Sequence, residues 1–243
     1  MENRAALETG SGHATRRPVI GIVLYPNVTL IDLANPQAAL HLFCDTHLLW
    51  KTLDPVPTDT GYSVVPTATF AECPERLDAL LVPGGLGTND AMQDDEILAF
   101  LKSRGADAAY IISVCSGSLI LGAAGLLDGH KAATHWAFYN ALKAMNVEAV
   151  HERVVTDGNR ITGGGATAGL DFGLTLLAKL TGEETARLSQ LLLEYDPQPP
   201  YNSGNPMTAS QDTVLQATAI IGGMSRAAVA IAKASLEGRH PLQ

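Results

Sequence analysis

Cys115 is the residue whose type and position in this sequence point most directly to chemistry. It stands between the branched apolar run "IISV" (111–114) and "SGSLILGAAGLL" (116–127), which has the length of a helix and ends before Asp128-Gly129. A strand that enters a helix through one sharp turn presents the turn residue at the carboxyl edge of a sheet. A thiol at a helix start also has its pKa lowered, because the positive end of the helix favours thiolate. The pattern predicts a nucleophilic cysteine.

The other two cysteines lack this setting. Cys44 and Cys73 are widely separated in sequence from each other and from Cys115, and they form no CxxC pair. The sequence also has no histidine cluster at the spacing of zinc ligands. We therefore expect neither a disulfide framework nor a structural metal, and we interpret Cys44 and Cys73 as packing residues.

A carboxylate and two glycine-rich loops are expected at the same edge as Cys115. An early apolar strand leads to Asp32, a second strand ends in "PGGLGTN" (83–89), and "TGGGATAG" (162–169) follows a third. Ligands collect at the carboxyl ends of parallel strands, where glycines let backbone N–H groups approach them closely. "TGGG" alone is weak evidence, because it lacks the lysine of a phosphate loop. The convergence of all these segments on one edge is the stronger signal.

The elements that must position these residues alternate along the chain. Apolar strand patterns occur at 18–25, 47–54, 77–85 and 108–114, with ribbons at 62–70 and 151–162. Helical patterns occur at 30–43, 94–105, 116–127, 136–145, 167–182, 183–196 and 209–238. We expect Asn35-Pro36 to interrupt the first helix and Gly222-Gly223 to split the last one. The alternation predicts an α/β sandwich with a mostly parallel sheet.

Composition limits the classes of partner. The chain has 243 residues, of which 46% are hydrophobic, so it can bury the core of one domain or of two small ones. A net charge of −9 disfavours nucleic acid and anionic membrane surfaces as partners. The first residues lack the apolar core of a signal peptide, and no stretch reaches the roughly 18 apolar residues of a membrane span. We expect a cytoplasmic protein with no membrane partner.

Five stretches of the sequence carry a family resemblance, which covers roughly residues 18–206. They are "LYPNVTLIDLANP", "VPGGLGTNDAM", "VCSGSLILGAAGLLDGHKAATHW", "HERVVTDGNRITGGGATAGLDF" and "LLLEYDPQPPYNSG". Together they resemble the ThiJ/PfpI superfamily, within the class I glutamine amidotransferase-like fold, and inside it the isonitrile (isocyanide) hydratases. The resemblance implies a flavodoxin-like three-layer sandwich and a homodimer. We take the α/β domain as 18–206, expect a disordered tail at 1–17 from its polar composition, and expect a helical extension packed on the same domain at 207–243.

The resemblance also assigns the site residues. It makes Cys115 the nucleophile, Asp32 the carboxylate beside it and Ser116 the hydroxyl that follows the nucleophile. The donor loop becomes Gly84, Gly85 and Leu86, and the backbone N–H of Ala166 is expected near the sulfur. An ionised Asp32 opposes the lowering of the cysteine pKa, so we expect the pair to share one proton and titrate as a unit.

The sequence departs from the family pattern at two positions. Asn35 stands before the proline where glycine is expected, and small Ala166 follows the glycine run where a bulkier apolar residue is familiar. Neither change removes a functional group, but both alter the shape of the pocket. Ser116 replaces the histidine of the peptidase-like branch, and the residues after Pro197 are too few for the DNA-binding region of the regulator branch, which argues against both functions.

A nucleophile beside one acid suits an isonitrile, R–N≡C, whose terminal carbon must accept both a nucleophile and a proton. The expected reaction is hydration to an N-substituted formamide through a covalent thioimidate, with Asp32 as general acid and base and no metal or organic cofactor. Backbone N–H groups of Gly85 and Ser116 are expected to stabilise the developing charge. Two alternatives stay open: a redox sensor in which Cys115 is oxidised to a sulfinate, and a glyoxalase-like activity.

His135 and Asp171 are the other polar residues near these motifs. We interpret His135 as a ring packed beside Trp136, and Asp171 as a partner of a buried backbone or hydroxyl group, with no chemical role for either. Leu188, Leu191, Leu192 and Tyr195 recur at the spacing of one face of an amphipathic helix. The spacing predicts an amphipathic helix over 183–196.

Overall fold

A seven-stranded sheet forms the middle of the computed structural model, which describes residues 16–239. The strand order is β10-β11-β7-β6-β1-β2-β5, and all neighbours are parallel except β10 and β11. The strands are β1 (Val19–Val23), β2 (Asp45–Trp50), β5 (Ala68–Thr69), β6 (Ala79–Val82), β7 (Tyr110–Ser113), β10 (Val154–Asp157) and β11 (Arg160–Gly163). Two small ribbons pair β3 (Val56–Pro57) with β4 (Ser63–Val64) and β8 (Lys131–Ala132) with β9 (Glu148–Ala149).

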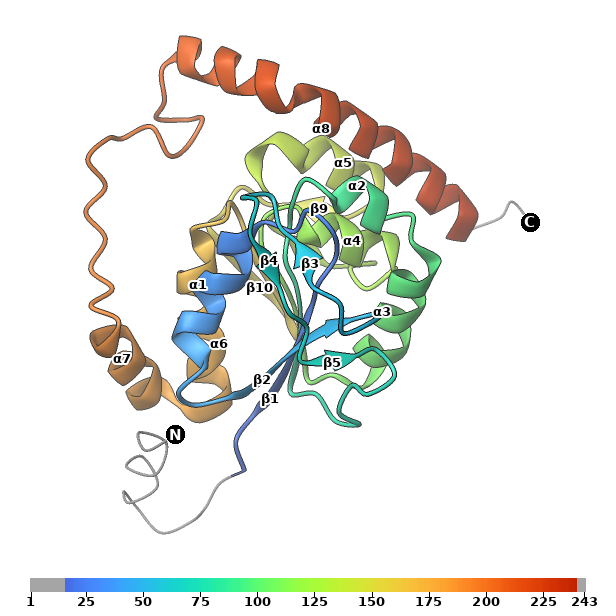
Figure 1. Ribbon diagram of the computed structural model, residues 1–243. Helices are drawn as coiled ribbons and strands as arrows, with labels where there is room; N and C mark the ends of the chain where they lie inside the picture. The colour runs from blue at the N-terminus through green and yellow to red at the C-terminus, as the bar shows by residue number, and fades with distance from the viewer. Residues whose placement is uncertain (1–15, 240–243) are drawn as a thin grey trace.

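Helices cover both faces of this sheet (Figure 1). One layer holds α1 (Leu30–Leu40), α6 (Ala168–Thr181) and α7 (Glu183–Leu192). The other holds α2 (Thr88–Ala91), α3 (Asp95–Asp107), α4 (Gly117–Ala123), the 3₁₀ helix η2 (Trp136–Phe138), α5 (Tyr139–Ala144) and α8 (Gln211–Arg239). The prediction of a flavodoxin-like α/β sandwich with a mostly parallel sheet is therefore confirmed.

The central strands are apolar along their whole length because helices bury both of their faces. The core accordingly contains fully buried residues from three adjacent strands: Ile20 and Ile22 of β1, Leu80 and Leu81 of β6, and Ile111 and Ile112 of β7. Of the predicted N-terminal tail, 1–15 lie outside the described residues. Arg16 and Arg17 pair with Asp78 (2.6 Å) and Asp45 (3.0 Å) at the start of the sheet.

The sequence predicted that Asn35-Pro36 interrupts the first helix, and this prediction was wrong. Helix α1 continues through Pro36 to Leu40. The reason is close packing on α6. A Cβ added at Gly169 would lie 3.1 Å from Pro36 Cδ, and one at Gly173 would lie 3.2 Å from Pro36 Cα. The two glycines therefore leave room for the proline ring between the helices, and this contact offsets the loss of one helical hydrogen bond.

The last helix is not split either, because α8 runs unbroken through Gly222-Gly223. Its second half packs on α5 and η2, where Ala228 and Ala232 are fully buried. Among the described helices, α8 alone is long and apolar enough, over Gln211–Gly238, to cross a membrane by length and composition. A single helix of this kind is weak evidence of a membrane span, because the core helices of soluble proteins meet the same criterion.

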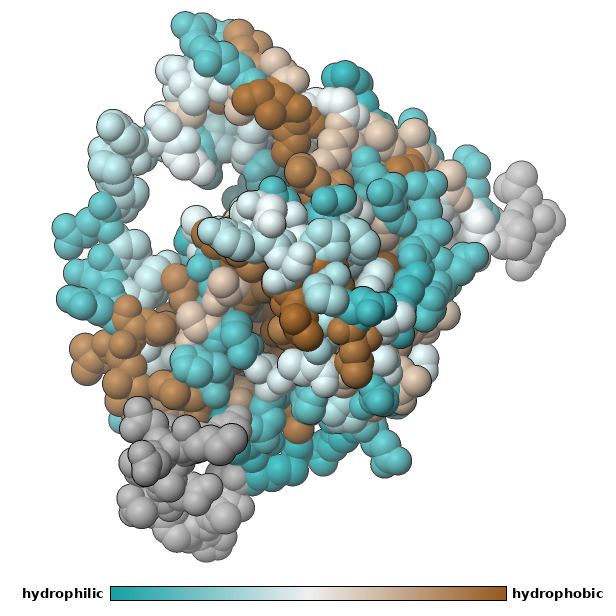
Figure 2. All heavy atoms as spheres, viewed as in Figure 1, coloured by the Kyte–Doolittle hydropathy of each residue, from teal (hydrophilic) through white to brown (hydrophobic). Residues whose placement is uncertain are grey.

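The segment between α7 and α8 stands away from the rest of the molecule. Residues 193–210 contain no helix or strand, and all residues of 196–209 except Pro206 and Ala209 are exposed. Figure 2 shows open space between this segment, which we call the arm, and the body of the protein. The predicted apolar face of α7 also points to solvent: Leu188, Leu191 and Leu192 are 43%, 77% and 56% exposed.

Candidate active site

The candidate site lies where the chain changes direction across the sheet. From β1 the chain passes through α1 to β2 on one side, and it later returns to β6 on the other side of β1. A crevice opens at such a point, at the carboxyl ends of the strands. Asp32 on α1, the 83–87 loop after β6 and Cys115 after β7 all belong to this edge, as the sequence predicted.

Cys115 occupies a sharp turn between β7 and α4. Its φ of 57° is in the left-handed region, which a residue with a side chain adopts only when its surroundings hold it there. Its N–H donates to the Gly164 carbonyl (2.7 Å), and its own carbonyl accepts from Thr134 Oγ1 (3.1 Å) and the His135 N–H (3.3 Å). These bonds fix the turn from two sides and supply the constraint that the strained backbone needs.

Two glycines let the loop after β6 approach this turn. A Cβ on Gly117 would lie 2.1 Å from the Val82 carbonyl oxygen. A Cβ on Gly84 would lie 2.5 Å from the Ser116 nitrogen and 2.9 Å from Cys115 Cβ. No side chain fits at either position without a backbone shift.

Asp32 is completely buried beside Cys115. Its Oδ2 accepts the Gly84 N–H (2.9 Å), and its carboxyl group interacts directly with the Cys115 thiol. Oδ1 has no hydrogen-bond partner among the described residues. Burial raises the pKa of Asp32 to about 7, and the Gly84 N–H opposes the rise. The carboxyl group is thus placed to hold or release a proton near neutral pH.

The pKa of Cys115 is raised, not lowered as its position at a helix start suggested. Burial is the largest cause and the charge of Asp32 the second, while the N–H and then the O–H of Ser116 favour the thiolate. The seven-residue helix α4 does not outweigh the loss of water. The charge of Asp32 raises the pKa of Cys115, and a hydrogen bond from Cys115 lowers the pKa of Asp32, so the two groups interact directly and we expect them to titrate as a pair.

The backbone N–H groups of the predicted donor loop make different hydrogen bonds from those we expected. The Gly85 N–H donates to Ser116 Oγ (3.2 Å), so it is engaged within the protein, whereas the Ser116 N–H is directed at the Cys115 sulfur. The Leu86 side chain is 63% exposed and points to solvent. Ser116 itself is buried, with its hydroxyl 2.7 Å from Thr88 Oγ1.

Ala166 lies next to the first helix. Its carbonyl accepts from Asn35 Nδ2 (3.3 Å), so the asparagine at the departure from the family pattern ties α1 to the start of α6. This contact joins the element that carries Asp32 to the glycine loop that accepts the Cys115 N–H. The two departures from the family pattern, Asn35 and Ala166, are therefore in contact with each other.

Several residues of the site were not predicted from the sequence. Thr88 and Tyr25 are fully buried behind Ser116, and the Gly164 carbonyl accepts the Cys115 N–H. Thr88 follows the glycines of "PGGLGTN", but a threonine in a polar loop gives no sign that it will be buried. Only the fold shows that this loop turns inward toward the cysteine.

His135 and Asp171 have structural contacts. His135 Nδ1 accepts the Ala137 N–H (3.3 Å), its ring packs beside Trp136, and burial lowers its pKa, which keeps the ring neutral. Asp171 is not buried; it pairs with Arg153 (2.5 Å) and accepts from the Tyr195 hydroxyl (3.2 Å). None of the described hydrogen bonds of these two side chains reaches the Cys115 sulfur, and we assign neither of them a chemical role.

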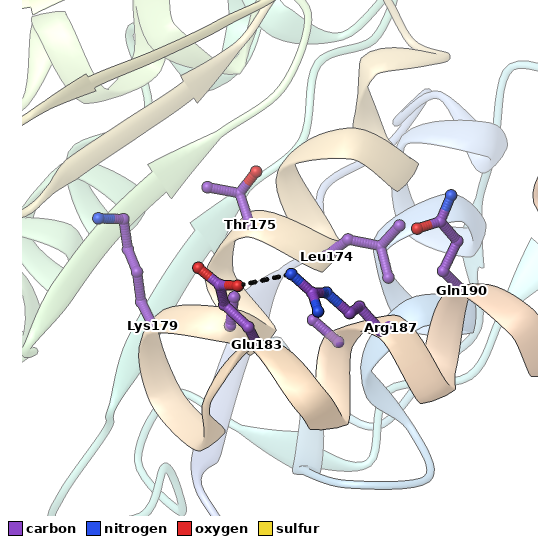
Figure 3. Close-up of a pocket in the computed structure, with 8 residues that line it drawn as sticks. Leu174, Thr175, Lys179, Glu183, Arg187 and Gln190 are labelled. Carbon is purple, nitrogen blue, oxygen red and sulfur yellow. Dashed lines mark hydrogen bonds and ion pairs between the residues drawn. The ribbon is translucent and has the colours of Figure 1, made fainter.

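A separate groove of about 430 Å³ lies between α6 and α7 (Figure 3). Leu174 and Thr175 of α6 face Gln190 of α7 across it, and Glu183 binds Arg187 (3.0 Å) along its side. None of the predicted site residues lines this groove. Within residues 16–239 no three histidine, cysteine, aspartate or glutamate side chains are grouped as a metal site requires.

The family follows from comparison with known proteins. The model of the DJ-1/PfpI family matches residues 20–179, and this chain belongs to that family. A crystal structure of a ThiJ/PfpI family protein from Pseudomonas syringae is similar to it with a TM-score of 0.88 and 42% identity, over 93% of this chain and 99% of that one. The resemblance identified from the five sequence stretches is confirmed.

Two curated relatives differ in how far the similarity extends. The isonitrile hydratase of Pseudomonas putida is 50% identical over 200 residues, which are 82% of this chain and 87% of that protein. The HTH-type transcriptional regulator GbdR of Pseudomonas aeruginosa is 30% identical over 185 residues, 72% of this chain but only half of the regulator. The first similarity spans most of both proteins, and the second is confined to a part of the regulator.

Proposed function

We propose that this protein hydrates isonitriles to N-substituted formamides, with Cys115 as nucleophile and Asp32 as general acid and base. The observation that carries the proposal is the contact between a partly buried cysteine at a strained strand-to-helix turn and a fully buried carboxyl group with a pKa of about 7. The similarity to the Pseudomonas putida hydratase over most of both chains supports the substrate class.

The first half of the reaction uses the proton that the pair shares. The Cys115 thiolate attacks the terminal carbon of R–N≡C while Asp32 gives that carbon its proton, so a C–S bond and a C–H bond form and a thioimidate results. Asp32 is then a carboxylate. Its raised pKa matches this task, because the acid must be protonated before the attack and give up its proton during it.

The second half returns the proton. The Asp32 carboxylate takes a proton from water as the oxygen attacks the thioimidate carbon, and this proton passes to the nitrogen. The new hydroxyl then gives its proton to the pair while the C–S bond breaks, which releases the formamide and restores Cys115. The Ser116 N–H stabilises the departing thiolate, since it is already directed at the sulfur. The steps sum to the addition of one water molecule, and none of them uses a metal or an organic cofactor.

The test of this proposal is direct. The purified protein is incubated with a simple aromatic isonitrile, and the formamide is measured by chromatography. We expect product with the wild-type protein and none above background with Cys115→Ala. Absence of product across several aliphatic and aromatic isonitriles would reject the hydratase and favour the redox sensor, in which Cys115 is oxidised beside Asp32.

The proposal includes a cytoplasmic homodimer, whose interface we place on the C-terminal part of the chain. The α/β domain is taken as 18–206, with 207–243 as a helical extension packed on it. Seven large apolar residues between 188 and 220 are exposed: Leu188, Leu191, Leu192, Tyr201, Met207, Leu215 and Ile220. Figure 2 shows apolar side chains gathered over α7 and along α8, on either side of the arm. In a symmetric homodimer the same apolar surface of each protomer is buried against the other protomer.

A further inference from the structure

Behind the nucleophile, three buried hydroxyl groups lie in a row. Ser116 Oγ is 2.7 Å from Thr88 Oγ1, and Thr88 Oγ1 is 3.4 Å from the Tyr25 hydroxyl. The three residues are 2%, 0% and 1% exposed, so water cannot supply missing hydrogen bonds. Each hydroxyl has one proton to donate and two lone pairs, and its choices are set by the protein.

The neighbouring groups leave the Thr88–Ser116 pair two arrangements. The Tyr25 hydroxyl donates to the Pro83 carbonyl (2.8 Å), and the Gly85 N–H donates to Ser116 Oγ (3.2 Å). Thr88 Oγ1 lies 2.7 Å from both the Gly85 carbonyl and Ser116 Oγ, so its proton can go to either. The Ser116 proton can go to Thr88 or to the Cys115 sulfur.

One arrangement suits a protonated or covalently occupied cysteine. Thr88 then donates to the Gly85 carbonyl, and Ser116 donates to Thr88. Every donor has an acceptor, and the Ser116 proton is directed away from a sulfur that has no negative charge to receive it. A thiol or thioether sulfur is a weak acceptor, so this direction is the favoured one.

The reverse arrangement suits the thiolate. Thr88 now donates to Ser116, and Ser116 donates to the negatively charged sulfur. The Gly85 carbonyl keeps the Thr88 N–H (3.1 Å) as its donor, and Ser116 Oγ accepts from both Gly85 and Thr88. Every donor again has an acceptor. The two arrangements differ only by rotation of two hydroxyl groups, with no proton transferred between them.

We infer that Thr88 is a positioning residue, which receives the Ser116 proton when Cys115 is neutral and releases it when Cys115 is a thiolate. Thr88 thereby keeps both states of the nucleophile free of an unsatisfied buried hydroxyl. The inference rests on the proposed function in one respect, that Cys115 is the nucleophile. It does not depend on the substrate.

The sign of the Thr88→Val effect follows from this role. Valine nearly preserves the shape but offers no acceptor, so the Ser116 proton has no partner except the sulfur. A buried donor without an acceptor is more costly than an acceptor without a donor, which destabilises the thiol more than the thiolate. Loss of the threonine is therefore expected to make Cys115 more reactive, by about tenfold at a fixed pH below its pKa.

The experiment measures the rate of Cys115 alkylation by iodoacetamide between pH 7 and 9, resolved from Cys44 and Cys73 by peptide mass spectrometry. We expect Thr88→Val to raise the rate about tenfold, Thr88→Ser to restore the wild-type rate, and Ser116→Ala to lower it. In the Ser116→Ala background Thr88→Val should have no further effect, because Thr88 acts through Ser116. Ser189→Ala, which removes a buried hydroxyl bonded to the Ala39 carbonyl on α1, is the matched control and should leave the rate unchanged.

Each other outcome overturns the inference. A rise of equal size in both backgrounds means that the substitution loosens the site. An unchanged, lower or immeasurably slow rate in Thr88→Val means that Thr88 does not accept the Ser116 proton. Thr88→Ala serves in the same way if the valine variant does not fold. No isonitrile is used, so a failure of hydration and a failure of this inference are separate results.

Discussion

The edge of the sheet around Cys115 and the C-terminal segment 183–239 are built in opposite ways. At the sheet edge, Cys115, Asp32 and Ser116 are enclosed by glycines and backbone groups of the same chain. The C-terminal segment is about a quarter of the described chain, yet it holds seven of the twelve exposed large apolar residues. The contacts of the first region come from one chain, and the second region exposes an apolar surface on which we propose that a second copy binds. Catalysis and assembly should therefore respond to different substitutions.

The largest expected effect is the loss of turnover on substitution of Cys115, the proposed nucleophile. Cys115→Ser retains the size of the side chain but replaces a thiolate with an alcohol, a much weaker nucleophile near neutral pH. We expect hydration of an aromatic isonitrile to fall at least a thousandfold. The oligomeric state, measured by light scattering, should not change. A substantial residual rate would reject the covalent mechanism.

The next effect is on stability, at the glycine beside the nucleophile. Gly117→Ala places a Cβ 2.1 Å from the Val82 carbonyl oxygen, so the backbone of the turn must move. We expect a loss of about 3 kcal/mol in the free energy of unfolding, the upper range for an overpacked interior. Chemical denaturation measures it. An alanine variant as stable as the wild-type protein would show that the turn is less confined than its geometry indicates.

Asp32→Asn is expected to lower turnover about a hundredfold, because the amide cannot give or take the proton. It should also change how stability depends on pH. The wild-type carboxyl has a pKa of about 7 when folded against 3.8 ordinarily, so folding binds a proton between these values. The contribution of Asp32 to the free energy of unfolding is largest below about pH 4, decreases as the pH rises to about 7 and is constant above that pH.

The stability of the Asp32→Asn variant does not decrease with pH in this way, because the amide does not titrate. Its stability relative to the wild-type protein should therefore increase between pH 4 and pH 7, by roughly 4 kcal/mol if no other group compensates. The loss of the negative charge should also lower the pKa of Cys115 and accelerate its alkylation. Equal pH profiles for the two proteins would contradict the assignment of a buried, protonated carboxyl group.

A smaller effect is expected on assembly. Leu191 is 77% exposed, so Leu191→Asp should change the stability of an isolated chain by no more than about 0.5 kcal/mol. In the proposed homodimer the substitution buries a charge on both protomers, and the dimer dissociation constant should rise at least tenfold. Light scattering at micromolar concentration measures it. A wild-type species of 25.5 kDa would show instead that the apolar surface serves another purpose.

The smallest expected effect is a gain. A Cβ added at Gly223 meets nothing within 4 Å, and the residue lies inside α8. Gly223→Ala should stabilise the protein by about 0.5–1 kcal/mol, in contrast to the same substitution at Gly117. Thermal unfolding of the two variants compares them directly. A loss of stability at Gly223 would indicate that α8 must bend there.

The parts of the fold predicted from the sequence are those decided by local chemistry. The ribbon predicted at 151–162 forms as β10 and β11 around the turn at Asp157-Gly158. The helix predicted from 94 forms as α3, and Asp94 accepts the N–H groups of Glu96 and Ile97 at its start. The strand-to-helix turn at Cys115 was also predicted, because a buried strand and a helix of small residues flank it. In these places propensity and tertiary structure agree.

The parts that could not be predicted depend on distant residues. Pro36 stays within α1 because glycines some 130 positions later leave room for it. The pKa of Cys115 rises because the surrounding fold removes water and the charge of Asp32 opposes a thiolate, and a helix-start argument includes neither effect. Thr88 is buried only because its loop folds over Ser116. Sequence patterns describe residues that are close along the chain, whereas burial depends on contacts between residues that are far apart in the sequence.

The glycines around the nucleophile also limit how this site can be modified by design or by natural variation. Gly84 and Gly117 reject even a methyl group, so the sheet side of the site cannot acquire new side chains. On the opposite side, a Cβ at Gly165 would meet only His135 Cδ2, at an ordinary 3.7 Å. A library built to change substrate preference should therefore leave the two confined glycines fixed and vary Gly165 and Ala166.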